Sequence, residues 1–163
     1  MKPLKIITGI AAQDVIDRQE GDFWKILKKL ARWSRRNPVK GDHIRVSRVI
    51  YYHHGIYIGN GKVIHYNTHG SGDGLLGDAR VICTSLDDFL EGGSCGVRNY
   101  FASERKSLYS PNSIVRRAKS KLGQEGYNLI FNNCEHFANW CTTGKRRSEQ
   151  VEDLFDIINR LND

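Results

Sequence analysis

The feature that most constrains the fold is a run of β-branched and aromatic residues with a tight-turn signal inside it. The run covers residues 42–66 and reads DHIRVSRVIYYHHGIYIGNGKVIHY. Isoleucine, valine and tyrosine favour strands, and Asn-Gly between two such runs is typical of a hairpin. We therefore expect one strand followed by a β-hairpin that turns at Gly59, Asn60 and Gly61.

The loop length of this hairpin decides which histidine shares a face with His65. A two-residue turn would pair Ile56 with His65, because strand residues alternate between faces. His54 would then lie on the same face as His65. This register remains the alternative to the one that we favour.

A three-residue loop, with Gly61 in the left-handed bulge position, would shift the register by one residue. Gly55 would then lie opposite His65, and His53 would share its face. We favour this register because glycine leaves room for the imidazole ring and because the opposite face becomes uniformly apolar. That apolar face would hold Ile56, Ile58 and Ile64.

Further elements follow from helical or alternating apolar spacing and from cap residues. Strands are expected at 79–84 and 95–102 and a Gly-rich loop at 67–78. Helices are expected over 22–36, over 84–93 with a Thr or Ser cap, and over 151–161. Another should begin at Pro111, bury Leu122 and stop at Gly123. A further helix should begin at Asn132 or Asn133. Strands before helices favour an α+β fold with packed helices on an antiparallel sheet.

Cys134 lies in the stretch FNNCEHFANWC, residues 131–141. Apolar residues follow it at helical spacing, and Asn132 or Asn133 would cap the helix, which places Cys134 in the first turn. Unpaired N–H groups and the helix dipole there would lower the pKa of a thiol and could receive an oxyanion. Cys134 is therefore a candidate nucleophile, although a lone buried cysteine is more often inert.

A nucleophilic thiol needs a base, and the favoured hairpin register supplies one. His53 would act as the general base, and His65 would orient it or stabilise its imidazolium form. Each strand histidine taken singly is more often a structural residue. Glu135 suits the first turn of a helix through the dipole alone, and His136 is interpreted as structural.

Metal or cofactor binding is the rival use of these residues. His65 and His69 are four residues apart, and Cys83 and Cys95 follow them. However, the two histidines run from a strand into a Gly-rich loop, and no C-x-x-C or H-E-x-x-H is present. The glycines also match no phosphate-binding or dinucleotide fingerprint, so we expect neither a metal nor a cofactor.

The net charge of +7 is concentrated near the N-terminus, where residues 23–40 contain seven lysines or arginines and no acid. Such a block favours an anionic partner: lipid headgroups, nucleic acid or an acidic protein. The alternative is a solvated helix face. Because Trp24 and Trp33 accompany the charges, we expect residues 23–36 to lie on an anionic membrane surface and do not expect nucleic acid.

Neither a membrane-spanning run nor a convincing signal peptide is apparent. The four cysteines form no C-x-x-C pair, which favours free thiols and a cytoplasmic location, with peripheral attachment to a membrane.

Three motifs together resemble the lecithin:retinol acyltransferase (LRAT) family: GDHIRV, then HHGIYIGNGKVIHY, then NNCEHFANWC. The likeness extends from Val39 to Val151. It implies a permuted papain-like fold of the NlpC type, in which two histidines precede the cysteine. At matching positions it implies Cys134 as nucleophile, His53 as base and His65 as third member.

Lipid-modifying members of that family move an acyl chain from a glycerophospholipid onto the cysteine and then to an alcohol, an amine or water. The resemblance thus implies an acyltransferase or acyl hydrolase with a phospholipid substrate. Several members carry a C-terminal membrane anchor, whereas the last residues here are polar and amphipathic. We expect an N-terminal extension at 1–38 and the catalytic domain at 39–163. The alternatives are an NlpC-type amidase or peptidase and a non-catalytic interaction module.

Overall fold

The computed structural model describes residues 21–49, 51–68, 79–126, 130–146 and 159. The chain divides into two units, Met1–Trp33 and Ser34–Asp163. Most of the expected Gly-rich loop and of the helix at 151–161 lies outside the described residues. Within the described part, no helix has the length and apolar character needed to cross a bilayer.

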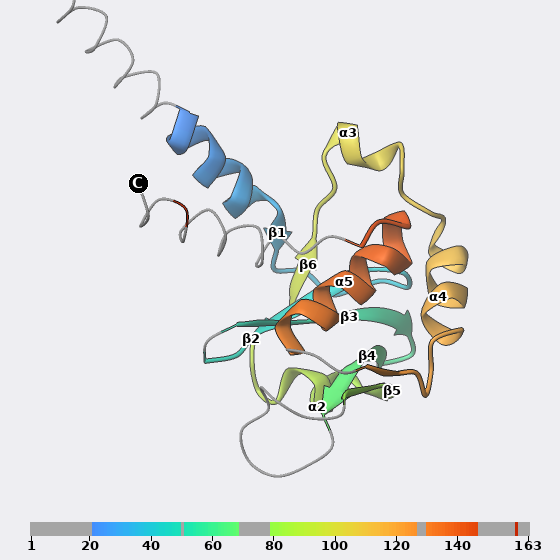
Figure 1. The fold of residues 1–163 in the computed structure, drawn as a ribbon. Helices are drawn as coiled ribbons and strands as arrows, with labels where there is room; N and C mark the ends of the chain where they lie inside the picture. Colours follow the sequence, from blue (N-terminus) through green and yellow to red (C-terminus); the bar gives the residue numbers. More distant parts are fainter. Residues whose placement is uncertain (1–20, 50, 69–78, 127–129, 147–158, 160–163) are drawn as a thin grey trace, which may run out of the picture. The chain divides into compact units, whose positions relative to one another are not determined.

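An antiparallel sheet forms the centre of the second unit (Figure 1). Its strands follow the order β1-β6-β2-β3-β4-β5-β7, and every pair with a defined register is antiparallel. The expected α+β class is therefore confirmed. The strands are β1 (Trp33–Ser34), β2 (His43–Ser47), β3 (Tyr52–Gly59), β4 (Lys62–Thr68), β5 (Ala79–Ser85), β6 (Gly96–Arg98) and β7 (Glu125–Gly126).

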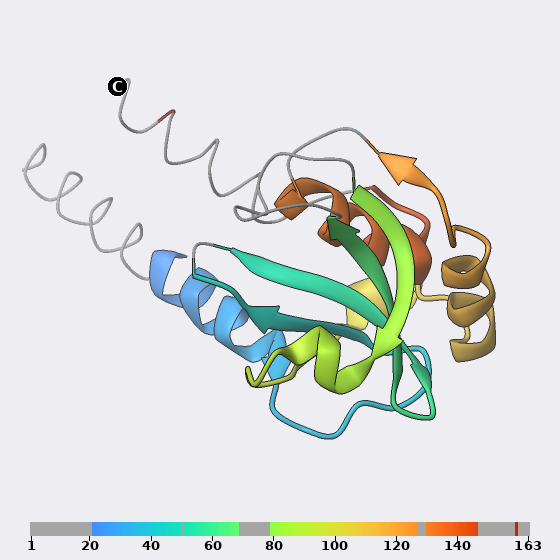
Figure 2. The same ribbon diagram turned by 90° about the horizontal axis from the view of Figure 1, so that it is seen from below.

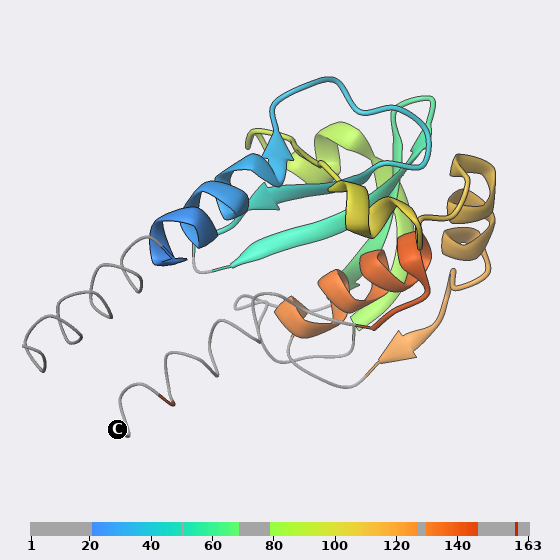
Figure 3. The ribbon, with the colours of Figure 1, turned by 90° about the horizontal axis from the view of Figure 1, so that it is seen from above.

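Helices cover both faces of this sheet (Figures 2 and 3). The short helix α2 (Leu86–Leu90) lies on one face, and α5 (Ile130–Thr143) lies on the other beside α4 (Pro111–Lys119). The expected caps are present, since Ser85 accepts from the Asp88 amide and proline opens α4. The small helix α3 (Ala102–Arg105) and strand β7 were not predicted.

One apolar cluster lies on each face of the sheet. The first joins the sheet to α4 and α5, and the second joins it to α2. The first includes Ile56, Ile64, Tyr66, Val81, Ile114, Cys134, Phe137 and Cys141, and the second includes Ile44, Val46, Val63, Phe89 and Val97.

The hairpin register that places Gly55 opposite His65 is confirmed. The bulge, however, was assigned to the wrong strand. Gly59 pairs with Lys62, so Asn60 and Gly61 form a two-residue turn with φ of 52° and 66°, and the irregularity lies between Tyr57 and Gly59. Positive φ at both central residues is the geometry that Asn-Gly favours.

Several boundary predictions were wrong. The strand expected over 95–102 covers only Gly96–Arg98, and Ala102 begins α3 instead. In the described residues the first helix ends at residue 31 and not at 36, because Trp33–Ser34 forms β1 and the Ser34 hydroxyl bonds Asn99 Oδ1 at 3.2 Å. Helix α4 ends at Lys119, and Leu122 is 46% exposed instead of buried. Helix α5 begins at Ile130, before the two asparagines expected to cap it.

Candidate active site

His53 and His65 form a buried hydrogen-bonded pair on the α2 face of the sheet. Nε2 of His53 lies 2.9 Å from Nδ1 of His65. Nδ1 of His65 also lies 3.0 Å from the Tyr66 carbonyl oxygen, and its Nε2 lies 3.0 Å from Thr84 Oγ1. Among the described residues, Nδ1 of His53 is buried and has no hydrogen-bond partner. The arrangement thus points one unpaired nitrogen of a fixed imidazole into the interior.

The ring of Phe89 holds both imidazoles in place. Its centroid lies 5.1 Å from the centroid of His53 and 5.1 Å from that of His65. Gly55 makes this packing possible, because a Cβ there would lie 2.7 Å from Val63 Cγ1 and 3.2 Å from His65 Cβ. A side chain at this position would push His65 or Phe89 aside.

The thiol of Cys134 lies at the point where β3 and β4 diverge. The β3–β4 ladder reaches Gly55 and His65, although both strands continue beyond it. Alternation along β3 turns the Tyr52 carbonyl and the His54 amide away from β2, toward this opening. Cys134 Sγ donates to the Tyr52 oxygen at 3.8 Å, and the His54 N–H bonds the sulfur. The sulfur therefore contacts both peptide groups that flank His53.

The apolar contacts of Cys134 and the rings of the histidine pair involve different faces of the sheet. Cys134 packs with Ile56 and Ile64 on the α5 face, whereas the rings of His53 and His65 lie on the α2 face. No hydrogen bond joins the Cys134 thiol to the His53 ring within the described part of the chain. The described contacts of the sulfur are with the peptide groups on either side of His53.

The acidity expected of Cys134 was wrong for this structure. The helix begins four residues earlier, so the cysteine lies in its second turn. The pKa of Cys134 is raised to about 12, mainly by burial and also by the nearby Glu135 carboxylate, while backbone hydrogen bonds from His54, Glu135 and Cys134 itself oppose the rise. The thiol is therefore protonated at neutral pH, and a proton acceptor is needed to activate it.

Both imidazoles of the pair are neutral at pH 7. Burial, followed by the charges of His65 and Arg48, holds the pKa of His53 well below 6.5. Burial likewise lowers the pKa of His65 to about 4, and the bond to the Tyr66 carbonyl opposes that shift. A neutral imidazole with an unpaired nitrogen can accept a proton, which is the chemistry that a protonated thiol requires.

A second histidine pair lies on the opposite face. Nε2 of His43 and Nδ1 of His54 are 2.8 Å apart, and both rings are buried. Burial is the main reason that the pKa values of both lie well below 6.5, and the charges of Arg45 and Arg98 lower them further. The sequence did not predict this pair.

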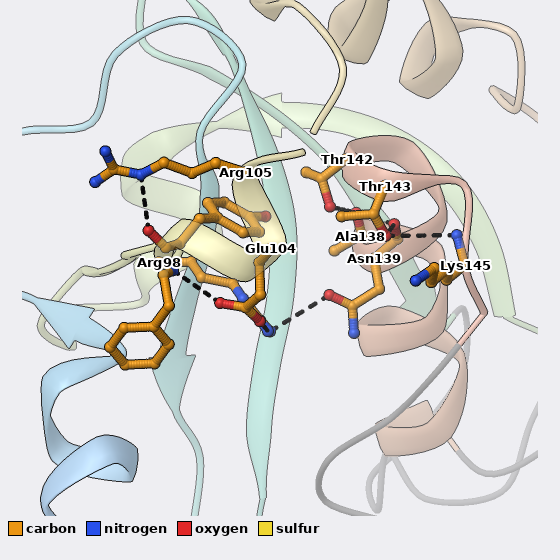
Figure 4. A network of polar contacts seen from close by, with 10 residues as sticks. Arg98, Glu104, Arg105, Ala138, Asn139, Thr142, Thr143 and Lys145 are labelled. Carbon is orange, nitrogen blue, oxygen red and sulfur yellow. Dashed lines mark hydrogen bonds and ion pairs between the residues drawn. The ribbon is translucent and has the colours of Figure 1, made fainter. Parts of the chain in front are cut away.

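Helix α5 is tied to the neighbouring segments through Arg98 (Figure 4). This buried side chain of β6 donates to Asn139 Oδ1 on α5 at 3.4 Å and to Glu104 Oε1 on α3 at 3.2 Å. The other oxygen of Glu104 accepts from the Phe101 amide at 2.9 Å. The network connects α5, the helix that carries Cys134, to strand β6 and helix α3.

Sequence reasoning missed three contributors to the His53–His65 pair: Thr84, Phe89 and Arg48. Arg48 donates to the Phe89 and Leu90 carbonyls at the end of α2 and lowers the pKa of both histidines. Thr84 reaches His65 only because β5 pairs with β4. A long connection between these strands leaves their register undetermined by any local turn signal.

The remaining candidate ligands do not assemble in the described part. The four cysteines, all within the described residues, form no disulfide, with Cys83 exposed and Cys141 buried. No group of three or more His, Cys, Asp or Glu side chains among the described residues could hold a metal ion. His69 lies outside those residues.

Comparison with known proteins identifies the family. The family model described as lecithin retinol acyltransferase matches residues 36–147. Lecithin retinol acyltransferase of Mus musculus is 31% identical over 140 residues, which cover 74% of this chain and 61% of the mouse protein. Human phospholipase A and acyltransferase 2 is 35% identical over 127 residues, which cover 72% of this chain and 78% of that protein.

Phospholipase A and acyltransferase 5 of Rattus norvegicus is 30% identical over 161 residues, which cover 93% of this chain and 55% of the rat protein. The alignment with the mouse lecithin retinol acyltransferase spans about three fifths of that protein's length, 61%. The match to the family model covers well over half of the 163 residues and contains both histidines of the hairpin and Cys134. The chain belongs to the lecithin retinol acyltransferase family.

Proposed function

We propose that the protein is a thiol-dependent acyltransferase or acyl hydrolase that uses Cys134, His53 and His65. The observation that carries the proposal is that the thiol contacts both peptide groups flanking His53, a neutral histidine whose second nitrogen bonds His65. Relatives named acyltransferase and phospholipase A support acyl chains of glycerophospholipids as the substrate. Because the two histidines precede the cysteine in the chain, we also infer the permuted papain-like arrangement.

In the first half of the reaction, His53 Nδ1 takes the proton of Cys134 as the sulfur attacks the ester carbonyl of the lipid. The tetrahedral intermediate collapses with cleavage of the C–O bond, and protonated His53 returns the proton to the leaving alkoxide. A lysophospholipid departs, and the acyl chain remains on Cys134 as a thioester.

In the second half, an alcohol, an amine or water gives its proton to His53 and attacks the thioester. The sulfur leaves and is reprotonated, which restores the starting enzyme. One difficult acyl transfer is thereby divided into two easier ones. The same residues serve transfer or hydrolysis, depending on the acceptor.

The reaction requires one particular pair of tautomers. His53 must carry its proton on Nε2, so that Nδ1 can accept from Cys134. His65 then accepts at Nδ1 and donates from Nε2 to Thr84, whose hydroxyl donates to the Ser85 carbonyl at 3.2 Å. When His53 is protonated, His65 can share the charge, because the Tyr66 carbonyl favours its protonated form.

Mass spectrometry of the intact protein after incubation with phosphatidylcholine vesicles tests this proposal. We expect an acyl adduct on Cys134, or lysophospholipid and free fatty acid if water is the acceptor. Both products should be absent with Cys134→Ala. Turnover of a peptide substrate without lipid reaction would favour the NlpC-type amidase, and no covalent chemistry on either substrate would favour an interaction module.

We propose in addition that the N-terminal extension, residues 1–38, binds anionic membranes and that 39–163 is the catalytic domain. Helix 21–31 exposes apolar side chains, with Trp24 59% and Leu30 70% exposed, and lysines at three positions. Apolar bulk together with positive charge suits an interfacial helix. The basic segment 23–36 therefore comprises a helix that ends at residue 31 and the strand β1 that follows it.

Co-sedimentation with liposomes tests the membrane proposal. The protein should bind anionic liposomes better than neutral ones and less well as salt rises, because each basic residue contributes about 1 kcal/mol that salt screens. The variant carries Lys25→Gln, Lys28→Gln, Lys29→Gln and Arg32→Gln, and a control of equal charge carries Lys106→Gln, Arg116→Gln, Lys119→Gln and Lys145→Gln. Equal binding by the two variants would remove the membrane assignment and leave the catalytic proposal untouched.

A further inference from the structure

We propose that Arg45 binds the phosphate of the phospholipid donor and thereby selects phospholipids over uncharged esters. The inference rests on the proposed function, because it assigns a recognition residue to the same site. It concerns a side chain that the proposed acyl transfer does not itself use.

The position of Arg45 beside the nucleophile follows from the register of β2 and β3. Arg45 lies directly opposite His54, whose amide bonds the Cys134 sulfur. Its guanidinium carbon lies 3.8 Å from the ring centroid of Tyr52, whose carbonyl accepts from the same thiol. The cation therefore stacks on one of the two residues that contact the nucleophile, and its backbone lies opposite the other.

The surroundings of Arg45 suit a bound anion. The side chain is half-buried, and Tyr52 beneath it is 39% exposed, so the stacked pair extends from the site to the surface. Burial lowers the pKa of Arg45, while Tyr52 and Glu135 raise it, and an arginine remains charged throughout the working pH range. Partial burial strengthens its attraction for a phosphate relative to a fully solvated lysine.

The geometry of stacking is compatible with phosphate binding. Contact with Tyr52 uses the face of the guanidinium, whereas hydrogen bonds to phosphate use its edge in a forked arrangement. In a glycerophospholipid the phosphate lies only a few bonds from either ester. A cation stacked on Tyr52, whose carbonyl accepts from Cys134, can therefore hold the phosphate while the ester carbonyl meets the sulfur, and a diacylglycerol lacks this contact.

Glu135 suggests the competing interpretation. It is buried directly after Cys134 and lies within electrostatic reach of Arg45. Arg45 could therefore serve only to balance that charge and to hold α5. The two interpretations differ in substrate selectivity, since a structural charge pair affects all acyl donors alike.

Steady-state kinetics with two donors separates them. Phosphatidylcholine and the diacylglycerol with the same acyl chains are presented in micelles of the same neutral detergent. Arg45→Gln should lower the ratio of kcat/KM for the phospholipid to that for the diacylglycerol by about tenfold, the effect of losing a charge-assisted hydrogen bond, mainly through KM. Arg45→Lys should restore part of the ratio. Arg80→Gln, which removes an exposed arginine paired with Glu125 on the same sheet, should leave it unchanged.

A second readout needs no turnover. We expect sn-glycerol 3-phosphate to slow the alkylation of Cys134 by iodoacetamide in the unaltered protein and in Arg80→Gln, but not in Arg45→Gln. Equal loss of activity on both donors, or an unchanged ratio, would overturn the assignment. Protection that depends on Arg45 while the ratio stays unchanged would also overturn it, because the ligand would then be a soluble phosphate ester. If neither donor reacts, the proposed function fails, and the alkylation result still judges Arg45 separately.

Discussion

Two histidine pairs lie on opposite faces of strands β2, β3 and β4, and the ring nitrogens of each pair are almost the same distance apart. His53 and His65 are joined at 2.9 Å on the α2 face, and His43 and His54 are joined at 2.8 Å on the α5 face. All four rings are buried, and burial is the leading cause of a lowered pKa in each. Their chemical roles must therefore come from what surrounds them.

The surroundings differ in charge and in hydrogen bonding. Two arginines, Arg45 and Arg98, lower the pKa of His43 and His54, whereas one, Arg48, lowers the pKa of His53 and His65, and each nearby cation makes protonation harder. The His53–His65 pair instead ends at the Thr84 hydroxyl, and the Tyr66 carbonyl can accept a hydrogen bond from His65 Nδ1 when that nitrogen is protonated. We infer that the His43–His54 pair is suited to structure and the His53–His65 pair to proton transfer.

The sharpest test of this comparison replaces one histidine of each pair by alanine. His53→Ala should lower acyl transfer at least about 100-fold, the smaller end of what general-base help contributes. His54→Ala should be much milder once activity is expressed per folded molecule, because its ring does not take the proton of Cys134. Release of fatty acid from phosphatidylcholine measures both. If His54→Ala were inactive and His53→Ala active, the roles assigned to the two faces would be reversed.

The second largest expected effect is the loss of folding stability as the pH falls. The folded pKa values of His43 and His54 lie below the unfolded value of 6.5, so below about pH 6.5 the unfolded chain binds protons that the folded protein excludes. Stability is then present above pH 6.5 and is lost as the pH falls toward the folded pKa values, by at most about 1.4 kcal/mol per pH unit for each histidine.

Urea unfolding of the unaltered protein and of the double variant His43→Gln, His54→Gln, followed from pH 7.5 to 5, measures this effect. The free energy of unfolding should fall less steeply in the variant. Parallel curves would mean that this pair is protonated in the folded state. The same experiment with His53→Gln and His65→Gln compares the two faces directly.

Much of this arrangement can be predicted from the sequence, for reasons visible at particular residues. The alternation of apolar residues and the requirement for space opposite His65 identify Gly55 as its partner and so bring His53 and His65 together. Local signals also locate the caps of α2 and α4, since Ser85 and Ser110 need only their own next turn.

The parts that could not be predicted depend on contacts distant in the chain. Helix α5 starts at Ile130 and buries Cys134 against β3, so the lowered pKa expected from a first-turn position is outweighed by burial. Trp33 and Ser34 leave the helical pattern because they pair at the edge of the sheet. The divergence of β3 from β4 beyond Gly55 has no sequence signal that we can identify, yet it makes room for the sulfur.

Gly55→Ala should disturb one face and spare the other. The added methyl would lie 2.7 Å from Val63 Cγ1 and 3.0 Å from the Phe89 ring, so we expect a loss of about 1–3 kcal/mol in the free energy of unfolding. Activity should fall as well, because Phe89 holds both catalytic candidates. Gly21→Ala is the control, since no heavy atom lies within 4 Å of its added Cβ. Retained activity and stability in Gly55→Ala would show that the packing around His65 is looser than described.

The smallest expected effect tests whether the α2 face of the sheet supports the reaction through hydrogen bonding or only through packing. Thr84→Val keeps the shape of the side chain but removes the oxygen that lies 3.0 Å from His65 Nε2. A net hydrogen bond contributes about 1 kcal/mol, which predicts a loss of roughly fivefold in kcat with little change in KM. Thr143→Val removes a comparable hydroxyl bond, 2.9 Å long, to the Asn139 carbonyl on α5, and should leave kcat unchanged. If Thr84→Val also left kcat unchanged, the tautomer of His65 would be set by the Tyr66 carbonyl, and the relay from His53 to Thr84 would have no part in the reaction.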